Sequence, residues 1–171
     1  MHTPPHTSIE HSFESQFIQE SSRAAGDREH FLLILQERKT LQDASLIATA
    51  DVSAKPVLFF NQHRQMVHAN PAAVSLVSIN SLQDGLGLRL GELLGCDHRM
   101  DGKNSDSNYS CHNCNCMPSM LTALDGKAAF EEKALVMHPD DETDSERFRI
   151  SCVPMIVGGQ RFAMMTMEPL Q

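Results

Sequence analysis

Tryptophan is absent from this sequence, and tyrosine occurs once in 171 residues. Proteins that bind unpaired bases or quaternary ammonium groups hold them on the faces of such aromatic rings. Basic residues are also few, because 14 lysines and arginines stand against 22 aspartates and glutamates and leave a net charge of −8. Binding to a phosphate backbone needs a basic surface. We therefore expect no nucleic-acid partner.

Long apolar runs are missing as well. No stretch approaches the roughly 20 apolar residues that a membrane-spanning helix needs. The opening stretch MHTPPHTSIEHSFES lacks the basic and then apolar order of a secretory signal. These absences predict a cytoplasmic protein with no membrane association. Because thiols stay reduced in the cytoplasm, cysteines that cluster there are more often metal ligands or redox groups than structural disulfides.

The chain divides by composition into three parts. Residues 1–26 are polar and predict a flexible N-terminal segment. Residues 27–50 predict an N-terminal helix, because Phe31, Ile34, Leu35 and Leu41 recur at helical spacing. The run FLLIL is broader than one narrow stripe, so this helix must bury apolar surface against its own domain or against a second copy. The second alternative predicts a homodimer formed through the N-terminal helix.

Residues 51–171 predict an α+β domain. Two strand patterns, VLFF and MVHAN, come first, and Asn70 then caps a helix whose first residue is Pro71. The stretch SLQDGLGLRLGELLG predicts short helices and turns, and MPSMLTALDGKAA predicts a longer helix that ends near Gly126. Three strand patterns follow: FEEKALVMH, RFRISCVPMIV and RFAMMTMEP. In the second of these, Cys152 alternates with polar residues and predicts a core side chain.

Four of the five cysteines lie between residues 96 and 116. Cys111 and Cys114 have the spacing at which a tight turn directs two thiolates at one ion. The favoured ligand set is Cys96, Cys111, Cys114 and Cys116, with His98 as an alternative ligand. Four thiolates suit zinc and also suit an iron–sulfur cluster. A metal-free thiol–disulfide pair is a further alternative.

This order of elements resembles a PAS domain, in which a five-stranded antiparallel sheet has helices between its second and third strands. The likeness is carried by PVLFFNQHRQMVHANPAAVSLVS, which is similar to the family's opening hairpin and first helix, and by IVGGQRFAMMTM, which is similar to its last hairpin. It covers Ala54 to Glu168. The resemblance implies an α+β fold with a PAS-like five-stranded antiparallel sheet, flanking helices and an N-terminal helix.

A narrower resemblance concerns the cysteines. Some sensory PAS domains of bacterial histidine kinases carry Gly-Cys-x-His, followed by Cys-x-x-Cys ahead of a helix. The corresponding stretches here are GCDH at residues 95–98 and CHNC at residues 111–114. Those relatives tend to have a further Cys-Gly between the two halves, whereas this chain has DGKNSDSNYS there and Cys116 afterwards. The resemblance implies a sensory role, with a histidine kinase or another signalling protein as partner.

Taken together, these features predict a sensory or regulatory PAS domain that is not an enzyme. Its cysteine-ligated centre would respond to redox state or to a gas if it is an iron–sulfur cluster, and would be a closed structural clip if it is zinc. Two alternatives stay open: a PAS-like dimerisation scaffold with a purely structural zinc site, and a thiol–disulfide redox protein. Haem is disfavoured, because MPSMLTALDGKAA offers no axial histidine, and the reactive-cysteine motif of flavin-binding PAS domains is incomplete.

Overall fold

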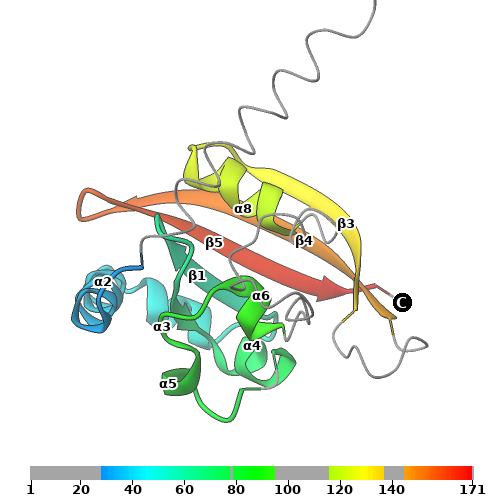
Figure 1. The fold of residues 1–171 in the computed structure, drawn as a ribbon, viewed down its shortest axis with the longest axis horizontal. Helices are drawn as coiled ribbons and strands as arrows, with labels where there is room; N and C mark the ends of the chain where they lie inside the picture. The colour runs from blue at the N-terminus through cyan, green and yellow to red at the C-terminus, as the bar shows by residue number, and fades with distance from the viewer. Residues whose placement is uncertain (1–27, 78, 95–115, 137–144, 171) are drawn as a thin grey trace, which may run out of the picture.

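The computed structural model describes residues 28–77, 79–94, 116–136 and 145–170. Within these ranges five strands form one antiparallel sheet in the order β2-β1-β5-β4-β3 (Figure 1). The strands are β1 (Val57–Asn61), β2 (Met66–Ala69), β3 (Ala129–Val136), β4 (Ser145–Val157) and β5 (Gln160–Pro169). The five-stranded antiparallel sheet expected from the resemblance is confirmed. The predicted flexible segment 1–26 lies outside the described residues.

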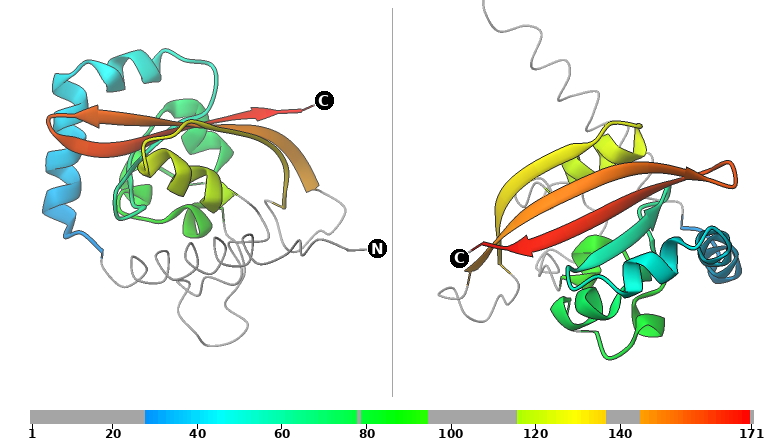
Figure 2. Two further views of the ribbon diagram at one scale, coloured as in Figure 1. Left: turned by 90° about the horizontal axis from the view of Figure 1, so that it is seen from above. Right: turned by 180° about the vertical axis from the view of Figure 1, so that it is seen from behind.

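Helices cover both faces of the sheet. They are α2 (Phe31–Asp43), α3 (Leu46–Asp51), α4 (Pro71–Leu76), α5 (Leu82–Gly85), α6 (Leu90–Leu93) and α8 (Cys116–Leu124). Figure 2 shows α3 on one face and α8 on the other, with α2 along the end at which β4 turns into β5. We call the face that packs against α4, α5, α6 and α8 the inner face, and the face that packs against α2 and α3 the outer face. None of the described helices is long and apolar enough to cross a membrane.

Strand β1 is apolar along its length because it is covered on both faces. Leu58 and Phe60 point into the inner core, while Val57 and Phe59 point into the outer core. A strand with one solvated face would alternate apolar and polar residues instead. Strand β5 lies beside β1 at the centre of the sheet, so the first and last strands of the domain pair with each other. The two cores are therefore built around the same central strand pair.

The last two strands supply much of the inner core. Cys152 of β4 is fully buried there, as expected from its alternation with polar neighbours. Met165 and Met167 of β5 lie on the same face and are also fully buried. Unbranched methionine side chains fill irregular gaps well. Cys152 is thus a packing residue of the inner core.

The range 27–50, expected to form one helix, contains two. Helix α2 ends at Asp43 and α3 begins at Leu46. Ser45 lies between them in the left-handed region with a φ of 60°, which turns the chain from one helix into the next. Leu41 of α2 and Ile47 of α3 nevertheless share the outer core. The two helices therefore pack on the sheet next to each other.

Helix α2 buries one side and exposes the other. Its buried side chains are Ile34, Glu37 and Leu41. Phe31 and Leu35, which helical spacing assigned to the apolar stripe, are 49% and 40% exposed. Packing of this helix on its own domain is confirmed. The apolar surface that it leaves uncovered keeps the homodimer as a prediction.

Candidate functional site

Most of the predicted metal ligands lie outside the described residues. These are Cys96, His98, Cys111 and Cys114, while Cys116 is the first residue of α8 and its side chain is not described. Among the residues that the structure describes, no group of three or more histidines, cysteines or carboxylates is placed to hold a metal ion. The structure therefore leaves the cysteine centre untested.

The elements on either side of the cysteine segment, residues 95–115, are described and share one core. Leu90, Leu93 and Leu94 at the end of α6 lie in the inner core, together with Met120 and other residues of α8. The described elements that precede and follow the segment, α6 and α8, therefore both pack on the inner face of the sheet.

Helix α8 is held firmly at its C-terminal end. The backbone carbonyl of Leu124 accepts a hydrogen bond from Nη1 of Arg161 on β5 at 3.2 Å. Gly126 follows with a φ of +93°, the left-handed conformation that commonly ends a helix. The predicted end of this helix near Gly126 is confirmed. A change at the N-terminus of α8 would thus act on a helix that is already bonded to β5.

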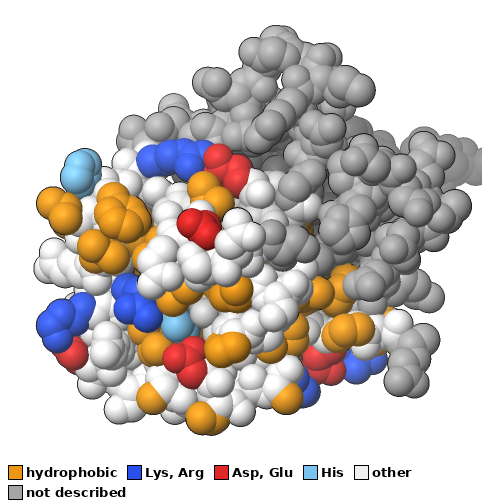
Figure 3. Space-filling model, turned by 90° about the horizontal axis from the view of Figure 1, so that it is seen from below, with side chains coloured by type: hydrophobic (Ala, Val, Ile, Leu, Met, Phe, Trp, Pro, Cys, Tyr) orange, Lys and Arg blue, Asp and Glu red, His pale blue; other side chains and the backbone are white. Residues whose placement is uncertain are grey.

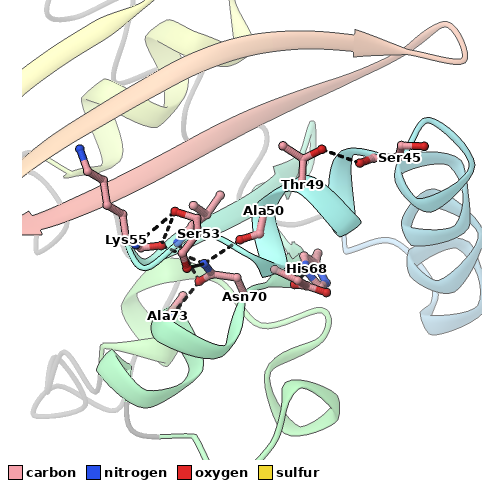
Figure 4. Close-up of polar contacts among 10 residues, drawn as sticks. Ser45, Thr49, Ala50, Ser53, Lys55, His68, Asn70 and Ala73 are labelled. Atoms are coloured by element: carbon pink, nitrogen blue, oxygen red, sulfur yellow. Dashed lines mark hydrogen bonds and ion pairs between the residues drawn. The ribbon is translucent and has the colours of Figure 1, made fainter.

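A buried asparagine joins the outer helices to the start of the sheet (Figure 4). Oδ1 of Asn70 accepts hydrogen bonds from the backbone N–H of Val57 at 3.0 Å and of Ala73 at 2.9 Å. Its Nδ2 donates to three carbonyls of the α3–β1 connection, those of Ala50, Ser53 and Lys55. The predicted N-cap role of Asn70 is confirmed. The same side chain also fixes how α3 enters β1, which a sequence pattern could not indicate.

Comparison with known proteins identifies the fold. No family model matches the chain, and no curated protein does. Among solved structures, the PAS domain of Bordetella pertussis BvgS superposes with a TM-score of 0.55 at 13% identity, over 76% of this chain and 87% of that domain. This chain has the PAS fold. A PAS domain from Colwellia psychrerythraea agrees, with a TM-score of 0.50 at 12% identity, over 76% of this chain and 96% of that one.

An RNA-binding light-oxygen-voltage receptor shares the PAS fold over part of its length. It superposes with a TM-score of 0.50 at 14% identity, over 76% of this chain and 34% of the receptor chain. At these identities the comparisons establish the architecture. They say nothing of what this chain senses or binds, so its chemistry has to be argued from its own residues.

The outer face of this PAS fold contains a buried histidine that joins β2 to α3. His68 is 1% exposed, and its Nε2 lies 2.8 Å from Oδ1 of Asp51, the last residue of α3. A carboxylate only accepts hydrogen bonds, so Nε2 carries the proton that it shares with Asp51. Burial lowers the pKa of His68, with a smaller contribution from the charge of Arg38, although the hydrogen bond to Asp51 opposes the change.

A buried carboxyl group joins α2 to β1. Glu37 is 7% exposed, and its Oε2 accepts a hydrogen bond from Nδ2 of Asn61 at 2.8 Å. Burial raises the pKa of Glu37, and the hydrogen bond from Asn61 opposes the change. Sequence reasoning missed this residue. The sequence nevertheless contains a signal for its burial. Glu37 falls at helical spacing between Ile34 and Leu41, which are both fully buried in the structure.

Proposed function

We propose that this chain is a cytoplasmic sensory or regulatory PAS domain of a signal-transduction protein. In this proposal a cysteine-ligated centre, an iron–sulfur cluster or zinc, is held by Cys96, Cys111, Cys114 and Cys116, with His98 as the alternative ligand. The chain itself catalyses no reaction. The PAS fold shared with the BvgS domain supports the sensory role, and the clustered cysteines support the centre.

The observation that carries the proposal is the placement of both ends of the cysteine segment on the inner face. Leu94, two residues before Cys96, and Met120, four residues after Cys116, belong to the same core. The described residues that flank the proposed ligands in the sequence therefore share one side of the sheet, which is compatible with a shared centre. Cys116 also opens a nine-residue helix, and the positive end of a helix favours the thiolate form that binds metals.

The proposed mechanism runs from the centre to α8 and then to the sheet. Cys96, Cys111, Cys114 and Cys116 would hold the centre next to the N-terminus of α8, and oxidation or loss of a cluster would release this stretch of the chain. Helix α8 packs on β4 and β5 and is bonded to Arg161, so its displacement acts on the central strands. Those strands also form the outer core against which α2 packs. A change in α2 is then passed to a second copy or to a kinase partner.

The exposed side of α2 supports a homodimer in this proposal. Leu32 and Leu33 are 67% and 45% exposed, next to the exposed Phe31 and Leu35. Figure 3 shows hydrophobic side chains gathered on the side of the surface where α2 lies. An apolar surface on a helix that is otherwise docked is typical of an interface with another chain.

Metal analysis of protein purified without air tests the cysteine centre. The expected result is iron with visible absorption for a cluster, or about one zinc per chain for a colourless protein. Replacement of Cys96, Cys111, Cys114 or Cys116 by serine should abolish metal binding. Cys152→Ala is the matched control, because Cys152 is a buried core residue of β4 outside the proposed ligand set, and should keep the wild-type metal content.

Other results of these measurements would distinguish between the alternatives. If Cys116→Ser keeps the metal and His98→Ala loses it, the ligand set is the alternative one. A redox-inert zinc whose removal leaves α2 unchanged would favour the structural scaffold over the sensor. Absence of both iron and zinc from the anaerobic protein would contradict the centre, and a reversible Cys111–Cys114 disulfide in that protein would favour the thiol–disulfide alternative.

The oligomeric state tests the proposed interface. Leu32→Glu places a charge at the centre of the exposed apolar surface of α2 and should convert a dimer into a monomer in light-scattering measurements. Val52→Glu is the control, because Val52 is 86% exposed but lies outside α2. A wild-type protein that is monomeric at high concentration would contradict the homodimer.

A further inference from the structure

Two residues ahead of α2 bond across to the inner layer. Nη2 of Arg28 lies 2.8 Å from Oε1 of Glu92 on α6, and Nη1 of Arg28 donates to the backbone carbonyl of Gly87 at 3.5 Å. Glu29 is the second residue, and its carboxylate lies 2.9 Å from Nε2 of His63 in the turn between β1 and β2. Residues that precede an outer helix are thus bonded to the inner layer and to a hairpin of the sheet.

Gln65 is the centre of these contacts. Its Oε1 accepts a hydrogen bond from the backbone N–H of Glu29 at 2.6 Å. Its Nε2 donates to the carbonyls of Glu29 at 3.4 Å and Gly87 at 3.1 Å. Gln65 is 3% exposed, so the amide group is held in place by the surrounding chain. We call this set, Arg28, Glu29, Gln65, Gly87 and Glu92, the edge clasp.

The edge clasp passes around the sheet at its β2 edge. Strand β2 is the outermost strand on this side, and Gln65 immediately precedes it. Helix α2 belongs to the outer core, whereas α6 belongs to the inner core. The clasp therefore joins the two helical layers directly, by side-chain contacts that do not pass through the strands.

We propose that the edge clasp couples α6, the last described element before the cysteine segment, to α2 around the edge of the sheet. Glu92 is bonded twice: its Oε1 to Arg28, and its Oε2 to the backbone N–H of Arg89 at 2.7 Å. Leu94, the C-cap of α6, directly precedes residue 95, where the cysteine segment begins. A displacement of α6 moves Glu92, and through Arg28 it moves the start of α2.

This coupling rests on the proposed function for its input, but the clasp can be tested without any metal. Loss of a partly exposed ion pair costs little free energy. Arg28→Gln should therefore raise the hydrogen-exchange rates of backbone amides on both sides of the clasp by about two- to fivefold. The amides to follow are those of Leu33 and Ile34 in α2 and those of Leu93 and Leu94 in α6, whose acceptors are known.

Two further variants serve as a test of the partner residue and as a control. Glu92→Gln should reproduce the effect on α2 while keeping an acceptor for the N–H of Arg89. Lys39→Gln is the matched control, because it removes an exposed ion pair with Asp43 on the same helix and should leave α6 unchanged. If Arg28→Gln accelerates exchange in α2 alone and leaves α6 at the wild-type rate, the clasp carries no coupling and the inference is overturned.

A second arm adds the metal. Exchange in the first turn of α2 is compared before and after EDTA treatment without air. The wild type should respond to metal removal, and Arg28→Gln should bind the same amount of metal without the response. An equal response in both proteins would assign the coupling to the sheet and overturn the clasp. If the wild type binds no metal, the proposed centre fails, and the metal-free arm alone decides the clasp.

Discussion

Glu37 and His68 are buried titratable groups of the outer face whose pKa values are shifted from the ordinary values of their side chains. Both lie where a helix meets the sheet, Glu37 between α2 and β1 and His68 between α3 and β2. Burial disfavours the charged form of each, so it raises the pKa of the acid and lowers the pKa of the imidazole. The stability linked to Glu37 is therefore lost as the pH rises, whereas the stability linked to His68 is lost as the pH falls.

Replacement of Glu37 by glutamine tests the effect of the buried carboxyl group. Because the folded pKa is raised above the ordinary value of 4.5, the stability linked to the protonated form is complete below pH 4.5. That stability is lost as the pH rises through the folded pKa. Glu37→Gln keeps an acceptor for Asn61 and cannot ionise, so urea unfolding should show no such loss.

At pH 7 this variant should be at least as stable as the wild type. Glu37→Ala is the contrasting variant, since it leaves Nδ2 of buried Asn61 without its acceptor and should cost about 1–3 kcal/mol. Equal destabilisation by both variants would mean that the charge on Glu37 has no measurable cost.

Replacement of His68 by glutamine tests the expected loss of stability at acidic pH. The folded pKa is lowered below the ordinary value of 6.5, so stability is complete above pH 6.5 and is lost as the pH falls through the folded pKa. Glutamine can still donate a hydrogen bond to Asp51 but does not titrate. The free energy of unfolding of the wild type should therefore fall more than that of His68→Gln between pH 7.5 and pH 5. Parallel curves for the two proteins would contradict this account.

Among the elements, α2 is positioned by the hairpin between β4 and β5 as well as by the outer core. A Cβ atom added at Gly158 in this hairpin would lie 2.9 Å from Cγ2 of Thr40 on α2. Gly159, the next residue, has open space around the corresponding position. Both glycines have positive φ values, 57° and 78°, so their substitution strains the backbone alike.

This pair of glycines offers an internal control for the docking of α2. Gly159→Ala should cost about 1 kcal/mol through backbone strain alone. Gly158→Ala should cost more, because it adds the contact with Thr40. Combining Gly158→Ala with Thr40→Ser, which removes Cγ2, should abolish this additional loss of stability in urea unfolding. Equal costs for the two glycine variants would show that the hairpin does not bear on α2.

At the scale of the whole molecule, the central pairing of β1 with β5 makes one folding unit of the two helical layers. The inner core includes described residues that precede and follow the cysteine segment, Leu94 and Met120, so a bound centre would be linked to the folded domain on both sides. A metal that binds the folded chain and not the unfolded one adds its binding free energy to the stability of the fold. The centre is therefore expected to contribute to global stability as well as to sensing.

Metal removal should lower the free energy of unfolding of the whole domain. A metal that binds only the folded chain stabilises it by about 2.7 kcal/mol when its concentration is a hundredfold above its dissociation constant. EDTA treatment should shift the urea midpoint of the wild type accordingly, and it should shift that of Cys152→Ala by a similar amount. Cys96→Ser should be insensitive to EDTA. An unchanged midpoint in a protein that demonstrably loses metal would contradict the expected stabilisation by the metal.

Local sequence patterns were sufficient for most of the elements, although not for the break between α2 and α3 at Ser45. The two opening strands, the cap at Asn70, the stop at Gly126 and the burial of Cys152 all follow from signals within a few residues. The PAS resemblance extended these signals to a five-stranded antiparallel sheet. The cysteine ligand set also came from spacing alone and stays a prediction.

The tertiary structure decided which surfaces meet. Which side of α2 is buried depends on contacts with strands distant in sequence, so Glu37 is covered while Phe31 is exposed. The pairing of Arg28 with Glu92 spans 64 positions, and no periodicity encodes it. The sequence by itself determined where most of the strands and helices form, because those choices depend on neighbouring residues. Only the packed layers decided which charges are buried and joined, because burial is a property of the whole arrangement.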